Sequence, residues 1–413
     1  MTRHNHHAPR ARSPVPRSRA EWVWRIGAAS GLAIAGWQGV LFSTAQAVNR
    51  SNPMLAHRLA PSDGRITAGY AITLVGPQAS AGDRRRADQL AKLALRQDPT
   101  VVLATAALGI DAQVRGDVAE ARRQFAYAQR LSRRDIRVQL WSIEDAVARG
   151  DIANALKWYD AALRVKPDLG SLLFPILTAA ANDTAVRPVL LRTLATRPPW
   201  GEGFVKYAAG NGPDPRLTAT LFKNLRSVGV PIPASAEAGV IDALMRQRSY
   251  DQAWAFYAST RPSVDRRRSR DASFTVAARA SSSQFDWVPV TTSEVTASLQ
   301  NGSFDFAAPA SVGGQMLWQK QLLPPGRYRL VGEADKSDQP NSTRPYWSLT
   351  CQDGAEIMRL ALPGSDKDNG RFATEFAVPQ GCAVQTLVLT ARPTDAVSGL
   401  SGRIDRAELI PVS

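Results

Sequence analysis

The sequence predicts a multidomain α plus β fold: a membrane helix, then an α-helical solenoid, then an antiparallel β-sandwich of jelly-roll type. Three observations predict it: an uncharged apolar run at residues 26–48, similar residues that recur every 34 positions, and short alternating segments after residue 273. A chain of 413 residues is long enough for two or three domains. We therefore expect a disordered basic tail (1–20), a transmembrane anchor or signal segment (21–48), helical repeats (50–260), a basic linker (261–272) and the β-sandwich (273–413).

The N-terminal segment predicts export. Residues 1–20 are rich in Arg, Pro and His, and they lack apolar periodicity, as disordered segments do. The run 26–48 carries no charge and is long enough for one membrane crossing. Because the Arg-rich side comes first, we expect a single-pass inner-membrane protein with a cytoplasmic N-terminus and its bulk in the periplasm. The alternative is a signal peptide cleaved after Ala47, since Ala45-Gln46-Ala47 is a small-residue cleavage site.

The charge of the chain argues against a nucleic-acid partner. The formal net charge is +15, but it is unevenly distributed, and residues 273–413 carry 12 basic and 14 acidic side chains. A uniformly basic nucleic-acid binder would not be partitioned in this way. Four Arg at positions 266–268 and 270 form a cluster, which we interpret as a solvated linker, with an anion-binding patch as the alternative.

Glycine returns every 34 residues between positions 82 and 150. Within one copy, Ala121, Phe125 and Ala128 share a helix face, because they are spaced at i, i+4 and i+7. Glycine at a turn takes positive φ and ends the first helix, and the Asp that follows it caps the second. The interval predicts three helix–turn–helix units, at 68–101, 102–135 and 136–169. The aligned positions are Gly82, Gly116 and Gly150; Asp83, Asp117 and Asp151; Ala87, Ala121 and Ala155; Ala91, Phe125 and Tyr159; Ala94, Ala128 and Ala162.

This pattern resembles the tetratricopeptide repeat family. The second copy carries the resemblance in the pair Leu108-Gly109, together with Gly116 and Phe125. In that family the groove of the stacked helices usually binds peptides or proteins, so the resemblance implies a protein partner. The alternative is that the array is only a spacer or a dimerisation element. Beyond residue 170 the pattern weakens, and we expect helices in the segments 172–183, 186–198, 214–229 and 236–260.

The C-terminal part predicts strands. Residues alternate with period two at 328–331 and 385–389, and turns are marked at 301–302, 324–326 and 379–381. Seven or eight such strands favour a jelly-roll sandwich. The segments "LLPPGRYRLVGEA" and "IDRAELIPV" resemble carbohydrate-binding-module-like β-sandwiches, which implies a glycan ligand stacked on aromatic rings. The candidate rings are Trp287, Trp318, Tyr346 and Trp347, with Trp287 as the one to test first; the alternative is that all four belong to the core.

The two cysteines, Cys351 and Cys382, are candidates for a disulfide in an oxidising compartment, with two separate buried thiols as the alternative. They have no His nearby, which argues against a zinc site. Residues 273–413 contain no His, which excludes Ser-His-Asp and Cys-His catalysis there. The acidic pair Asp366 and Asp368 is typical of a solvated turn. We expect no enzyme, no catalytic residue, no cofactor and no metal site.

Together these features predict a membrane-anchored periplasmic scaffold that mediates protein–protein interactions in polysaccharide or envelope assembly or in secretion. The assignment to such assemblies is an analogy at the level of fold. The alternative function is carbohydrate binding, in which the β-sandwich binds glycan and the repeats act as a spacer.

Overall fold

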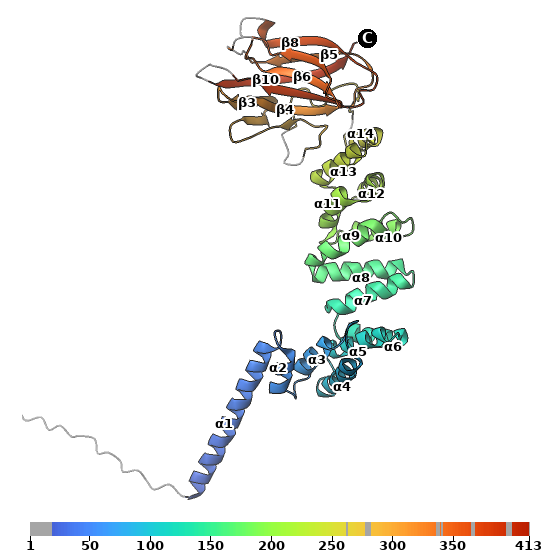
Figure 1. Ribbon diagram of the computed structural model, residues 1–413, viewed down its shortest axis with the longest axis vertical. Coiled ribbons are helices and arrows are strands. Elements are labelled where there is room, and N and C mark those ends of the chain that lie inside the picture. The colour runs from blue at the N-terminus through green and yellow to red at the C-terminus, as the bar shows by residue number, and fades with distance from the viewer. Residues whose placement is uncertain are drawn as a thin grey trace, which may run out of the picture. The chain divides into compact units, whose positions relative to one another are not determined.

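The computed structural model describes residues 19–261, 263–276, 282–335, 339, 342–364, 368–393 and 399–412. Within these ranges the chain is helical up to residue 258 and forms strands from residue 288 onward, which confirms the α plus β fold class (Figure 1). It divides into two compact units, residues 1–145 and 146–413. The boundary falls inside α7 (Ile136–Ala148).

The first unit begins with α1 (Arg19–Val48), a helix of 30 residues. None of its apolar window is buried, and its length and composition suffice for a membrane span or a signal sequence. At 1.5 Å per residue a helix of this length extends about 45 Å. Its end packs through Ala45 against a small cluster with Ala56, Ala60 and Ile66. The other complete helices of the unit are α2 (Pro53–Leu59), α3 (Gly64–Thr73), α4 (Ala81–Gln97), α5 (Val102–Val114) and α6 (Val118–Leu131).

The pair α5–α6 forms for the local reasons that the sequence indicates. Gly116 takes φ of +80° in the turn, and the Asp117 carboxylate accepts a hydrogen bond from the backbone N–H of Glu120 at 3.0 Å. Phe125 is fully buried against Gly109, where an added Cβ would lie 2.8 Å from the ring. The Gly109 position therefore lets α5 approach α6 closely.

The first copy of the 34-residue pattern differs from this arrangement. Gly82 was aligned with the turn glycine Gly116, but it lies in the first turn of α4. The Ser80 hydroxyl caps this helix by accepting a hydrogen bond from the Asp83 N–H at 3.0 Å. Because Ser is a strong N-cap and Asp is favourable in a first helical turn, α4 starts earlier than the repeat interval predicts.

The second unit continues with helix pairs and ends in the β-sandwich. At its start, Gly150 takes φ of +67° and the Asp151 carboxylate caps α8. The segments expected beyond residue 170 are helical, but α11 was not expected, because its glycines Gly203 and Gly210 weaken the helical signal. The helices are α8 (Ile152–Val165), α9 (Gly170–Ala180), α10 (Val186–Ala195), α11 (Gly201–Asn211), α12 (Pro215–Ser227), α13 (Ala234–Arg246) and α14 (Tyr250–Ala258).

The sandwich consists of two five-stranded antiparallel sheets. Alternation along each strand places one set of side chains in the core between the sheets, including the fully buried Tyr328, Leu330 and Trp347. One sheet has the order β1 (Val288–Pro289), β4 (Gly314–Gln321), β9 (Gln385–Ala391), β6 (Tyr346–Cys351) and β7 (Glu356–Ala361). The other has the order β2 (Thr296–Gln300), β3 (Ser303–Ala308), β10 (Leu400–Pro411), β5 (Gly326–Ala334) and β8 (Arg371–Val378).

Candidate binding sites

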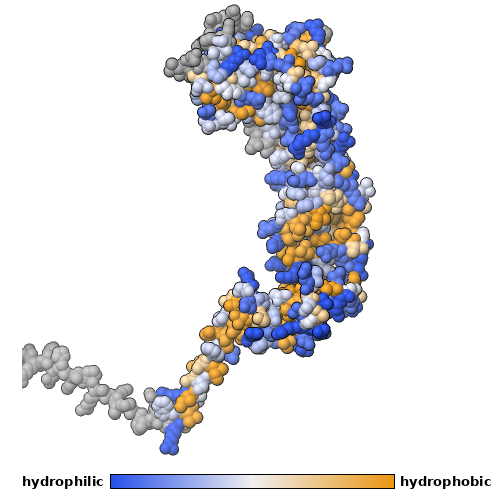
Figure 2. All heavy atoms as spheres, viewed as in Figure 1, coloured by the Kyte–Doolittle hydropathy of each residue, from blue (hydrophilic) through white to orange (hydrophobic). Residues whose placement is uncertain are grey.

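Helix α9 presents an apolar stripe on its exposed side. Leu172 and Ile176 are 55% and 52% exposed, and Pro175 and Ala179 are exposed as well. Their spacing of i, i+3, i+4 and i+7 places all four on one helix face. The opposite face is also apolar, because Leu173 and Leu177 are buried. We call the four exposed residues the α9 stripe; hydrophobic side chains gather over α9 in Figure 2.

An aromatic cluster supports the α9 stripe from behind. The ring of Phe174 lies 5.8 Å from that of Phe204 and 6.0 Å from that of Tyr207, measured between centroids. Trp200 packs on Phe204, and its indole N–H donates a hydrogen bond of 2.9 Å to the Asp160 carboxylate. Aromatic packing of this kind fixes α9 against α11. The stripe is thus an exposed apolar surface on a helix that is packed from behind.

The basic linker is solvated only in part: Arg267 and Arg268 are exposed, but Arg270 is buried against the sandwich, which corrects its interpretation as solvated. Arg270 is 6% exposed, and its guanidinium donates hydrogen bonds to the carbonyl of Phe285 at 2.9 Å, to the carbonyl of Lys320 and to the side chain of Gln321. The guanidinium also lies 5.7 Å from the ring centroids of Trp254 and Phe285. Arg is suited to this position because its planar fork offers several donors at once.

The neighbouring polar groups are satisfied by one another. The Asp286 carboxylate accepts hydrogen bonds from the Tyr257 phenol, from Arg261 at 3.0 Å, and from the backbone and hydroxyl of Ser283. Burial lowers the pKa of Arg270 to about 10, so the guanidinium stays charged at neutral pH. A cavity of about 520 Å³ adjoins these groups. Because its carboxylate and guanidinium groups are already paired, we assign this cluster a structural role.

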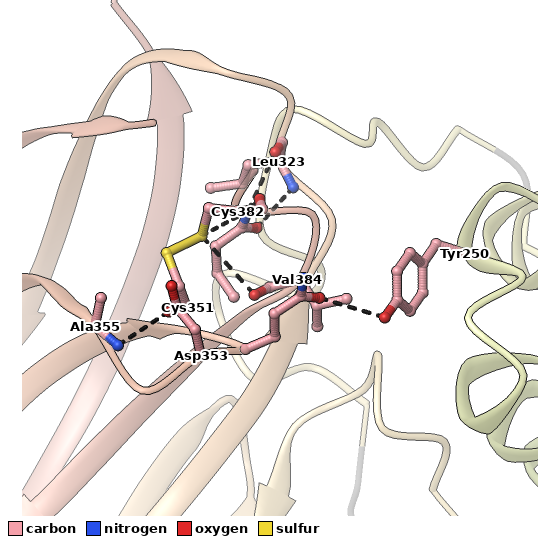
Figure 3. The surroundings of a disulfide bond; sticks show 9 residues. Tyr250, Leu323, Cys351, Asp353, Ala355, Cys382 and Val384 are labelled. Atoms are coloured by element: carbon pink, nitrogen blue, oxygen red, sulfur yellow. Dashed lines mark hydrogen bonds between the residues drawn. A yellow bond between two sulfur atoms is a disulfide. The ribbon is translucent and has the colours of Figure 1, made fainter. Parts of the chain in front are cut away.

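A second cavity, of about 450 Å³, lies where the end of α13 and the start of α14 face β1 and β4. Trp318 lines this cavity and is half-buried, whereas Trp287, which is among the residues around the 520 Å³ cavity, is only 2% exposed. Tyr250 supplies a second ring. Its hydroxyl donates a hydrogen bond of 3.3 Å to the side chain of Gln352, next to the disulfide (Figure 3). We call this space the Trp318 cavity.

The other candidate aromatics expose little of their rings or are covered by neighbouring side chains. Trp287, the first candidate from the sequence, is 2% exposed, and its indole N–H donates a hydrogen bond of 3.0 Å to the carbonyl of Asp271. Trp347 is fully buried. Tyr346 is half-buried, with the guanidinium groups of Arg359 and Arg392 each 4.5 Å from its ring centroid. The flanking Asp286 and Pro289 suggest a loop around Trp287, but Pro289 belongs to strand β1 and the Trp287 ring is part of the sandwich core.

Cys351, at the end of β6, is joined by a disulfide to Cys382, before β9 (Figure 3). Both are buried, and the amide of Gln385 bridges the carbonyls of Cys382 and Leu323. The disulfide fixes Cys351 and, with it, the adjacent Gln352. The side chain of Gln352 accepts the hydrogen bond from the Tyr250 hydroxyl.

No group of three or more His, Cys, Asp or Glu side chains that would hold a metal ion occurs among the described residues. Asp366 and the side chain of Asp368 lie outside those residues, as does the tail at 1–18. Hydrogen bonds lower the pKa of several exposed acidic groups, as where Arg329 lowers the pKa of Glu375, whereas burial raises the pKa of Asp405. Such pairs are typical of a folded surface.

No protein-family model matches the chain, and no curated protein matches it. Solved structures give low similarity. An arabinose-bound MgGH51 α-L-arabinofuranosidase is 13% identical with a TM-score of 0.27, covering 34% of this chain and 26% of its own length. The enzymatically active domain of tailspike protein 4 of bacteriophage CBA120 is 16% identical with a TM-score of 0.24, covering 36% of this chain and 21% of its own. The chain thus spans about a quarter or less of either protein.

Proposed function

We propose that this chain is a membrane-anchored scaffold whose helical repeats bind a protein partner, in polysaccharide or envelope assembly or in secretion. The observation that carries the proposal is the α9 stripe, since Leu172 and Ile176 expose apolar surface on a helix that is already packed on its other face. A partner that offers an apolar segment would bury this surface, at about 25 cal/mol for each Å² removed from water.

Two features support the location. Helix α1 has the length and composition of a membrane span, and basic residues precede its apolar part. The disulfide between Cys351 and Cys382 is of a kind that persists in oxidising compartments. Both favour a periplasmic position for the part of the chain that follows α1, either anchored or released after Ala47.

The proposal is tested by photo-crosslinking from position 176 in the full-length protein in membranes. We expect one protein to be crosslinked there, and the purified partner to bind the wild-type chain but not Ile176→Glu. Val228→Glu is the matched control, because Val228 is also 52% exposed but lies at the end of α12, outside the α9 stripe. Equal binding by Ile176→Glu and the wild type would reject the α9 stripe as the binding surface.

A second candidate function is glycan binding by the β-sandwich, with the repeats as a spacer. One observation favours it: the Trp318 cavity combines an accessible aromatic ring with polar side chains. This candidate is tested by saccharide binding to the full-length protein and is compatible with a protein partner on α9.

A further inference from the structure

The Trp318 cavity carries more positive than negative charge. Arg246, the last residue of α13, and Lys320 of β4 line it. Within the ranges that the structure describes, neither side chain has an ion-pair partner. The carboxylate that lines the cavity, Asp242, accepts a hydrogen bond of 2.6 Å from the amide of Gln284. The cavity therefore offers two unpaired cations and one carboxylate that is held in place.

The rings and the cations are arranged around the same space. Trp318 and Lys320 are two residues apart on β4 and so lie on one face of the sheet. Tyr250 comes from the facing helix and is held by its hydrogen bond to Gln352 (Figure 3). A volume of about 450 Å³ falls in the range of small-molecule sites and accommodates one or two sugar rings.

These side chains select among ligand classes. The flat face of an indole packs against the C–H face of a sugar ring, because the π system is negative and those hydrogens are positively polarised. Arg and Lys pair with an anionic group, and the oxygens of Asp242 accept hydrogen bonds from hydroxyl groups. A carboxylate in the cavity disfavours a ligand dense in negative charge, such as a polyphosphate. The combination fits a polyhydroxylated ring that bears a single anionic group.

We propose that the Trp318 cavity binds an acidic saccharide, in which a carboxylate on the sugar pairs with Arg246 and Lys320 while the ring stacks on Trp318. This proposal rests on the second candidate function above and names its ligand class. The disulfide and the packed linker hold the two sides of the cavity together through Gln352 and Arg270, so the site is largely formed before the ligand arrives.

The experiment is calorimetric titration of the full-length protein in a neutral-lipid nanodisc with trigalacturonate and with galactotriose. These probes have the same ring stereochemistry, and they differ at C6 and in linkage. We expect trigalacturonate to bind at least about tenfold more tightly, with an affinity that falls as salt is raised, since partly exposed charges are screened. Lys320→Gln and Arg246→Gln should each weaken trigalacturonate binding about tenfold. Arg267→Gln, an exposed Arg outside the cavity, is the control and should change nothing.

Substitutions at Trp318 test the stacking. Trp318→Leu keeps apolar volume but removes the flat ring, and it should abolish binding, whereas Trp318→Tyr should restore part of it. Thermal melting shows whether each variant is folded. Equal affinity for the two saccharides would overturn the acidic specificity but leave glycan binding intact. Binding of neither saccharide would reject both the acidic specificity and glycan binding by the sandwich. Displacement of trigalacturonate by a glutamate-rich peptide at similar concentration would overturn the saccharide class in favour of an acidic peptide.

Discussion

The phenol of Tyr257, near the end of α14, donates a hydrogen bond of 2.7 Å to the carboxylate of Asp286, just before β1. The ring of Phe285 meets the Tyr257 ring edge-on at a centroid distance of 5.3 Å. Burial, together with the negative charge of Asp286, raises the pKa of Tyr257, so the phenol remains a donor at neutral pH. The last helix pair is therefore joined to the sandwich by buried polar and aromatic contacts, and this junction leads to the first prediction.

Replacing Arg270 by Ala should lower the free energy of unfolding of the second unit by about 3 kcal/mol, because buried acceptors on Phe285, Lys320 and Gln321 lose their donor. Urea denaturation followed by tryptophan fluorescence measures this, since Trp254 lies beside the guanidinium. Arg267→Gln removes the same charge from an exposed neighbour and should have little effect. Equal loss in both variants would mean that charge, and not the hydrogen bonds, is responsible.

Gly109→Ala should destabilise the first unit by about 1–3 kcal/mol, because the new methyl group overlaps the Phe125 ring in a closely packed core. Gly210→Ala provides the opposite control. Gly210 lies in α11 with nothing within 4 Å of an added Cβ, so the same substitution should gain up to about 1 kcal/mol from helix propensity. Thermal melting of both variants measures these changes in stability. Higher stability of Gly109→Ala than of the wild type would refute the close approach of α5 and α6.

The double variant Cys351→Ser with Cys382→Ser should unfold more easily by about 3–4 kcal/mol, as the chain-entropy model gives for a closed loop of this size. The two cysteines are 31 residues apart. A reducing agent should lower the melting temperature of the wild-type sandwich to about that of the double variant. It should leave the melting temperature of the double variant unchanged. Identical melting of the oxidised and reduced wild type would contradict this.

Acidification should weaken the first unit through His57. Its burial, with the nearby Arg86, lowers the pKa of His57 below the ordinary value of 6.5. As pH falls through 6.5, the unfolded chain therefore takes up a proton that the folded chain does not, so stability is lost on going down in pH. Melting temperatures at pH 7.5 and pH 5.5 measure the loss, which should be smaller in His57→Gln. If acidification raised the melting temperature in the wild type and not in His57→Gln, the effect of His57 would have the opposite sign. That outcome would contradict a lowered pKa of His57 in the folded chain.

The sequence predicts best what neighbouring residues decide. Gly116 with Asp117, and Gly150 with Asp151, ended one helix and capped the next as expected, because turn and cap chemistry acts within three residues. Alternation at Tyr328 and Leu330 likewise sufficed to place β5, because side-chain direction follows strand geometry.

What the sequence could not predict depends on distant partners. Arg270 is buried because Phe285 and Gln321, 15 and 51 residues away, surround it, and its Arg-rich neighbours suggest solvent instead. The choice between Trp287 and Trp318 likewise depends on which ring the core and helices cover. The α9 stripe did have a signal: the run "LLFPIL" is apolar on both sides of a helix, so one side must find a partner outside it or stay exposed.

The buried guanidinium of Arg270 has a consequence for how this chain is divided into modules. A fragment that starts at residue 273 would lack Arg270 and the aromatic rings of α14, and it would leave Phe285 and the acceptors of β4 open to water. The sandwich and the last helix pair therefore form one structural module. Gene fusion or domain exchange that preserves folding should cut before α13 rather than in the Arg-rich segment, where composition alone would place the boundary.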